Sequence, residues 1–188
     1  VALSTVRISA DGAEFGVPRL GFSVPRSKYD LPRPDSGRAI VVDAASGAVS
    51  GNAIDGGRYF DGPLADAASV GIDVIQDGTV VVRGNLVNGW RVGIRIQEGA
   101  TAESNSVSNS RTGIQAFGGL VTGNVASYNL DGIELHGAAT ARRNSLQKNY
   151  RSGVIVDLLA SGAINENNFL GNGGTDGLAQ CGIRRIGG

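Results

Sequence analysis

Several features that mark common classes of protein are absent from this sequence. The 188 residues include a single cysteine, Cys181, and a single histidine, His136. One cysteine excludes an internal disulfide bond, and no Cys/His spacing of the kind that holds zinc is present. The sequence also has no convincing phosphate-binding glycine loop and no Ser-His-Asp order. It therefore predicts no metal site and no cofactor.

The chain also lacks an excess of charge and long apolar runs. Its 17 Lys and Arg residues balance 17 Asp and Glu residues, so the bulk charge predicts no binding to nucleic acid or to a membrane surface. No run of about 18 apolar residues is present, so we expect no insertion into a membrane. The first residues show no signal segment, which fits a processed secreted chain as well as a cytosolic one.

Glycine, by contrast, is abundant and regularly placed. The chain has 30 glycines, about twice the usual share of roughly 7%. Six of them open a short segment with Ile or Val as the next residue, and they follow one another at intervals of 19 to 29 residues: Gly71, Gly93, Gly113, Gly132, Gly153 and Gly182. A period near 20 residues is typical of a solenoid, in which the chain winds into stacked, similar coils.

The residues around these glycines predict strands rather than helices. After each glycine, apolar residues alternate with variable ones, which is the period of two of a half-buried strand. Asparagines recur eight or nine residues before the next glycine, at Asn85, Asn105, Asn124 and Asn144. We expect these asparagines to take the left-handed backbone conformation at corners and to stack into a hydrogen-bonded ladder.

This combination resembles the right-handed parallel β-helix of the pectin-lyase-like superfamily, with its Gly-Ile strand starts and stacked asparagines. The resemblance covers residues 37–188 and implies an all-β solenoid of about six coils. Residues 1–36 hold four of the five prolines and no asparagine, so we interpret them as an irregular N-terminal cap or connection. At the C-terminal end, open strand edges favour self-association or a continuation into further chain.

Outward side chains at equivalent positions of successive coils form columns about 4.8 Å apart. Around the single histidine these columns gather charged groups. Glu134 and His136 share one strand and one face, Asp157 is one coil away, and Arg95 lies two coils away in the column of Glu134. A histidine with carboxylate neighbours suits proton transfer near neutral pH. The sequence therefore makes these four residues the candidate catalytic residues.

A second set of outward residues suits the binding of a ligand. It combines three arginines, each two residues before a repeat glycine, with amide, aromatic and carboxylate side chains of the neighbouring columns: Arg91, Arg111, Arg151, Phe117, Gln97, Gln115 and Asp73. Arginine binds carboxylates and sulfates through two parallel hydrogen bonds. This set predicts a face on which an extended anionic chain lies.

We therefore expect an extracellular or cell-surface β-helix module that binds an extended, anionic polysaccharide. Two alternatives stay open. The first is a polysaccharide lyase or uronate C5-epimerase, because Asp131–His136 is similar to the Asp-Gly…His strand of mannuronan C5-epimerases, with Glu134-Leu135 in place of their Asp-Pro. The second is a non-catalytic structural module of a larger surface or phage-type protein.

Overall fold

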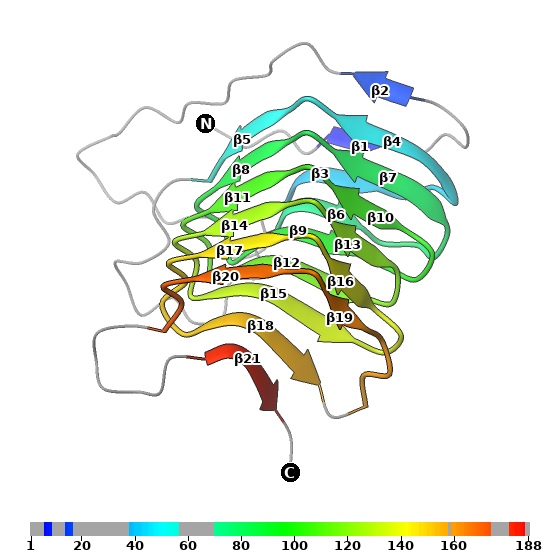
Figure 1. Cartoon of the computed structure of the whole chain (residues 1–188). Helices are drawn as coiled ribbons and strands as arrows, with labels where there is room; N and C mark the ends of the chain where they lie inside the picture. The colour runs from blue at the N-terminus through cyan, green and yellow to red at the C-terminus, as the bar shows by residue number, and fades with distance from the viewer. Residues whose placement is uncertain are drawn as a thin grey trace, which may run out of the picture.

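The computed structural model describes residues 6–8, 14–16, 38–56, 70–157, 159–173 and 181–186. Within these ranges all regular elements are β-strands, and they wind into a stack of coils (Figure 1). Strands at equivalent positions of successive coils pair in parallel. The expected all-β parallel β-helix is thereby confirmed. The same ranges contain no helix that is long and apolar enough to cross a membrane.

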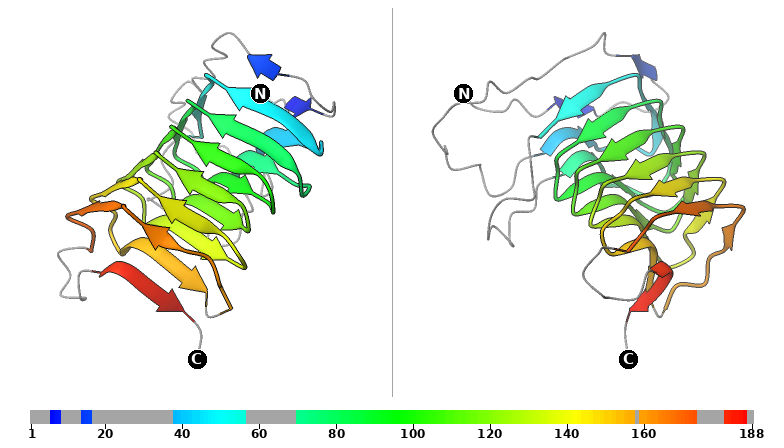
Figure 2. Two further views of the ribbon diagram at one scale, coloured as in Figure 1. Left: turned by 45° about the vertical axis from the view of Figure 1, so that its right-hand side comes forward. Right: turned by 60° about the vertical axis from the view of Figure 1, so that its left-hand side comes forward.

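Three parallel sheets run along the stack and form its sides (Figure 2). Sheet A contains β1 (Val6–Ile8), β3 (Arg38–Val42), β6 (Val70–Val74), β9 (Val92–Ile96), β12 (Thr112–Phe117), β15 (Asp131–His136), β18 (Ser152–Asp157) and β21 (Cys181–Ile186). Sheet B contains β2 (Glu14–Gly16), β4 (Ser46–Ser50), β7 (Thr79–Arg83), β10 (Thr101–Glu103), β13 (Leu120–Thr122), β16 (Thr140–Arg142) and β19 (Ile164–Asn165). Sheet C contains β5 (Ala53–Asp55), β8 (Leu86–Asn88), β11 (Ser106–Ser108), β14 (Val125–Ser127), β17 (Ser145–Gln147) and β20 (Asn168–Leu170).

The glycine-led segments of the sequence are the strands of sheet A, and their inward residues form the core. Ile72, Ile94, Ile114, Ile133 and Val154 are completely buried. Ile183 was expected to extend this ladder, and it does pair with Val154, but 49% of its surface is exposed. It is exposed because β21 is the last strand of sheet A in the described order, so no further coil of that order packs over it.

The repeat glycines are required by the close stacking of the coils. A Cβ atom added at Gly113 would lie 2.5 Å from the carbonyl oxygen of Gly132 in the next coil. At Gly132 the same addition would lie 2.5 Å from the carbonyl oxygen of Gly153. Such distances are far shorter than any van der Waals contact of carbon, so a side chain at these positions pushes the coils apart.

Stacked asparagines line the inside of one corner, as expected. Each Nδ2 donates to the Oδ1 of the next asparagine along the stack, at 2.9–3.0 Å, in the order Asn52, Asn85, Asn105, Asn124, Asn144 and Asn167. The same Oδ1 also accepts the backbone N–H of the preceding asparagine, as between Asn105 and Asn124 at 2.9 Å. The ladder therefore satisfies polar groups that would otherwise be buried without partners.

The expected backbone conformation of these asparagines was wrong. The left-handed conformation falls on the residue just before each ladder asparagine, with φ between 54° and 70°, at Gly51, Gly84, Ser104, Gly123, Arg143 and Glu166. The asparagine itself uses its side chain for the ladder, so the corner is turned by its neighbour. A second ladder, which the sequence repeat did not predict, joins Ser110, Asn129, Asn149 and Asn172.

Residues 1–36 lie outside the described ranges apart from β1 and β2. These two strands pair with β3 and β4 and so extend sheets A and B by one strand each. The division of the chain at residue 36 into a cap and a β-helix stays a prediction.

Candidate functional site

The outward face of sheet A carries the predicted columns in the expected register. Asp73 pairs with Arg95, Arg95 with Gln115, and Gln115 with Glu134 on successive strands. Phe117 pairs with His136 at the next outward position, two residues further along β12 and β15. The parallel register of sheet A therefore brings together side chains that are about 20 residues apart in the sequence.

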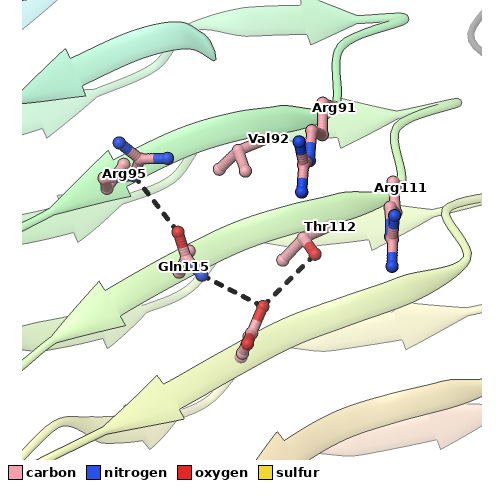
Figure 3. Close-up of a pocket in the computed structure, with 7 residues that line it drawn as sticks. Arg91, Val92, Arg95, Arg111, Thr112 and Gln115 are labelled. Carbon is pink, nitrogen blue, oxygen red and sulfur yellow. Dashed lines mark hydrogen bonds between the residues drawn. The ribbon is translucent and has the colours of Figure 1, made fainter. Parts of the chain in front are cut away.

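A pocket of about 300 Å³ opens on this face across three coils. It is lined by three arginines, two neutral polar residues, one valine and one carboxylate: Arg91, Arg95, Arg111, Thr112, Gln115, Val92 and Glu134. Figure 3 shows Arg91 and Arg111 near the starts of neighbouring strands and Arg95 further along its strand. The lining contains three arginines and a single carboxylate, so it is suited to an anion.

A chain of hydrogen bonds fixes the polar side chains of this pocket (Figure 3). Arg95 Nε donates to Gln115 Oε1 at 3.1 Å, and Gln115 Nε2 donates to Glu134 Oε2 at 3.2 Å. Thr112 Oγ1 donates to the same carboxylate oxygen at 3.3 Å. Each partner comes from the strand next to it in sheet A, so the stacking of the coils sets the orientation of the pocket lining.

The histidine lies beside the pocket and between two carboxylates. His136 Nε2 is 3.1 Å from Glu134 Oε1, and His136 Nδ1 is 3.1 Å from Asp157 Oδ2. The imidazole ring stacks on the ring of Phe117, with 4.5 Å between centroids and 8° between planes. The neutral ring can donate to one of these carboxylates, whereas the protonated ring can donate to both. Both ring nitrogens are thus engaged by protein groups.

Asp73 occupies an outward position but is completely buried. Arg38 Nε lies 3.0 Å and Arg95 Nη1 lies 3.6 Å from its Oδ2, from the strands on either side. Within the described ranges neither carboxylate oxygen has a hydrogen-bond partner. Burial raises the pKa of Asp73 above its ordinary value of 3.8, and the two arginines oppose this effect only in part. Asp73 contacts Arg95 from the neighbouring strand β6 and is not itself part of the pocket lining.

The three arginines of the predicted stripe have different surroundings. Arg91 and Arg111 line the pocket, whereas Arg151 donates through Nε to Asp131 Oδ1 at 2.9 Å and through Nη2 to Asp131 Oδ2. This hydrogen-bonded pair raises the pKa of the Arg151 guanidinium and neutralises its charge. Gln97 directly follows β9 and is half-buried, and it is not part of the pocket lining.

Two residues of this face were not singled out from the sequence. Thr112 immediately precedes a repeat glycine, a position at which Asp131 and Ser152 also place a polar group in the next coils. Arg38 pairs with Val70 at the start of its strand and reaches Asp73 in the neighbouring strand. The polar residue before the glycine recurs in the sequence and could have been noticed there. The contact of Arg38 with Asp73 could not, because it depends on the conformation of a long side chain.

The charged groups around the histidine do not form a metal centre. The imidazole separates Glu134 from Asp157, so the three donor groups do not converge on one point. In the part of the chain that the structure describes, no three or more His, Cys, Asp or Glu side chains are arranged to hold a metal ion. The site offers hydrogen-bond donors and charge rather than metal ligands.

A protein-family model provides one comparison with known proteins. The model described as periplasmic copper-binding protein (NosD) matches residues 34–175. The match covers most of the chain and includes all strands that contribute to the pocket on sheet A. No curated protein matches the chain, and no solved structure matches it.

Proposed function

Because the chain belongs to the family described as periplasmic copper-binding protein (NosD), we propose that it acts in the periplasm or elsewhere outside the cytoplasm, as a module that binds an extended anionic polysaccharide. This family consists of right-handed parallel β-helices of the pectin-lyase-like superfamily, in agreement with the resemblance noted in the sequence. Membership gives the fold and a coarse location. The proposed ligand rests on the pocket of sheet A.

The single observation that carries the proposal is the set of three arginines around one pocket. Arg91, Arg95 and Arg111 come from two neighbouring coils, and all three line this pocket, Arg91 and Arg111 near the starts of their strands and Arg95 further along. Guanidinium groups bind carboxylates and sulfates with charge-assisted hydrogen bonds, each contributing about 1.5–3 kcal/mol. A pocket of about 300 Å³ is at the small end for ligand sites, which suits one charged unit of a longer chain.

The surroundings of the pocket favour an extended ligand over a small ion. Phe117 lies six positions after Arg111, which directly precedes β12, a span of about 20 Å at roughly 3.3 Å per residue. Phe117 is 39% exposed and is fixed by its stacking on His136. Its open face can pack against the apolar face of a sugar ring. A saccharide chain lying along β12 thus meets charge at one end and an aromatic surface at the other.

The description of the family raises copper as an alternative ligand. Copper sites in proteins draw on Cys, Met and His side chains, and this chain has one cysteine, one histidine and no methionine. The described residues contain no clustered set of metal ligands. The donor set therefore does not fit a copper centre, and the proposed function involves no copper.

Binding is favoured over lyase or epimerase chemistry by the state of the histidine. A general base needs a ring nitrogen within hydrogen-bond reach of the proton that it removes. Both ring nitrogens of His136 already face carboxylates, at 3.1 Å each. Arg95, the candidate for neutralising a uronate, is held by Gln115 and Asp73. The geometry thus supports a binding face more directly than a catalytic one.

The proposal predicts that Arg91 and Arg111 carry the affinity for the polysaccharide. We expect the double variant Arg91→Ala/Arg111→Ala to bind an oligogalacturonate about 100-fold more weakly, because two charge-assisted interactions are lost at about 1.5 kcal/mol each. Titration calorimetry or fluorescence titration with the wild type and the variant measures this change.

A matched control is Arg83→Ala/Arg142→Ala, which removes the same charge from the exposed face of sheet B. The control is expected to retain the wild-type affinity, and added salt is expected to weaken wild-type binding because the contacts are ionic. If both double variants lost affinity equally, the net charge of the protein would explain the loss, and the pocket would not. Absence of binding in the wild type would favour the purely structural module instead.

A further inference from the structure

The pocket on sheet A contains one strong hydrogen-bond acceptor, the carboxylate of Glu134, among groups that mainly donate. We propose that Glu134 determines specificity, by accepting a hydrogen bond from a hydroxyl group of the ligand while Arg91 and Arg111 bind its anionic group. The ligand unit is then a hydroxylated anion, such as a uronic acid residue, rather than an anion without hydroxyl groups. This inference rests on the proposed function and assigns the substrate class of the same pocket.

The carboxylate of Glu134 is held in a fixed position. Thr112 and Gln115 donate to Oε2 at 3.3 and 3.2 Å, and His136 Nε2 lies 3.1 Å from Oε1. The side chain of Glu134 is only 18% exposed. These contacts come from two strands, and they prevent the carboxylate from turning away when an anion enters the pocket.

Glu134 still has capacity for a ligand. An ionised carboxylate offers about four lone-pair sites. Thr112 and Gln115 donate to two of them on Oε2, and the imidazole Nε2 of His136 faces a third on Oε1. The remaining site can accept a hydroxyl proton from a sugar. The carboxylate would otherwise face the incoming anion with nothing between them, and the two like charges would repel each other.

This arrangement gives a physical basis for discrimination. An anion without hydroxyl groups gains the arginine contacts but has no donor to place against the carboxylate of Glu134. A hydroxylated anion gains the same contacts and places a donor against that charge. Sites built to bond a substrate hydroxyl reject analogues that lack it, because the buried polar group of the protein is left unpaired.

The test compares two ligands that share a six-membered ring and one carboxylate, methyl glucuronide and cyclohexanecarboxylate. We expect the wild type to prefer the glucuronide by about tenfold or more, equivalent to one hydrogen bond to a charged group. In Glu134→Gln this preference is expected to fall to about threefold or less, because a neutral amide accepts more weakly and no longer repels the bare anion. Chemical shift titrations by NMR measure both affinities at the concentrations that such small ligands require.

Two further variants separate specificity from stability. Glu134→Asp keeps the charge but withdraws the carboxylate by one methylene, and we expect it also to lose the preference. Glu103→Gln removes a carboxylate charge from β10 of sheet B, away from the pocket, and is expected to leave the preference unchanged. Thermal melting of each variant establishes that it is folded at the temperature of the titration.

The outcomes distinguish this inference from the proposed function. Equal affinity of the wild type for the two ligands, with both lost in Arg91→Ala/Arg111→Ala, would overturn the role of Glu134 and leave the anion site intact. A preference that survives in Glu134→Gln and Glu134→Asp would overturn it as well. Failure of the wild type to bind either ligand or an oligogalacturonate would remove the proposed function itself.

Discussion

Replacing Asn124 by alanine is expected to destabilise the protein by about 3 kcal/mol or more, because three buried groups each lose a partner at a cost of about 1–3 kcal/mol. Asn124 Oδ1 accepts from both the backbone N–H and the Nδ2 of Asn105, at 2.9 Å each. Its Nδ2 donates to the carbonyl of Ala102 at 2.9 Å. The three groups that lose a partner are the backbone N–H and the Nδ2 of Asn105 and the carbonyl of Ala102. They lie inside the stack, where water does not replace the lost partner.

Urea denaturation of the wild type and of Asn124→Ala measures this loss. Asn165→Ala is a suitable control, because Asn165 is exposed at the end of β19 and takes no part in the ladder; its effect is expected to stay within about 0.5 kcal/mol. A loss of less than about 1 kcal/mol in Asn124→Ala would show that the ladder is not needed to hold the coils together.

The variant Gly113→Ala is expected to lose about 3 kcal/mol or more, because the added methyl group meets backbone that cannot move aside. The new Cβ would lie 2.5 Å from the carbonyl oxygen of Gly132 and 3.0 Å from Asn129 Nδ2. The first contact belongs to the parallel pairing of β12 with β15, and the second belongs to the other asparagine ladder. Relief of the clash therefore requires two coils to separate.

Gly84→Ala isolates the alternative explanation, namely backbone strain. Gly84 has φ of 62°, and a Cβ atom there would meet nothing within 4 Å. The replacement is expected to lower the free energy of unfolding by about 1–2 kcal/mol, because alanine is strained in the left-handed conformation. Thermal or chemical denaturation of the two variants compares steric and conformational costs directly. If Gly84→Ala proved as costly as Gly113→Ala, close stacking would not be the reason for the repeat glycines.

The fold was predictable because the repeat specifies it several times over. A glycine that must sit against the next coil and an apolar residue that must face the core recur in each turn, as Gly113-Ile114 and Gly132-Ile133 illustrate. The period of two then gives the parity of each strand, and the near-constant spacing gives the register. The sequence therefore predicted correctly which outward residues are neighbours on adjacent strands, as for Gln115 and Glu134.

The state of individual side chains was less predictable, because it depends on neighbours outside the column. Asp73 has outward parity, yet Arg38 and Arg95 lie against it from two strands and it is buried. Arg151 occupies the same repeat position as Arg91 and Arg111, but its guanidinium group is hydrogen-bonded to Asp131. A column predicts which residues are adjacent, but the length and charge of each neighbour decide which groups stay available for a ligand.

The second asparagine ladder shows a different limit. Asn129, Asn149 and Asn172 are stacked as regularly as the first set. Their column begins with Ser110, which accepts the backbone N–H of Trp90 at 3.2 Å. Because serine and tryptophan occupy the earlier coils, residue identity does not repeat there, although the hydrogen-bonding role does. A search for repeated asparagine alone therefore finds one ladder and overlooks the other.

The most direct test of the account is a crystal structure of the protein grown with an oligogalacturonate. The account predicts saccharide along the outward face of sheet A, with one carboxylate within hydrogen-bond distance of Arg91 and Arg111 and a sugar ring against Phe117. Saccharide bound to sheet B or sheet C, or bound to sheet A without contact to either arginine, would contradict the claim that this pocket is the binding site.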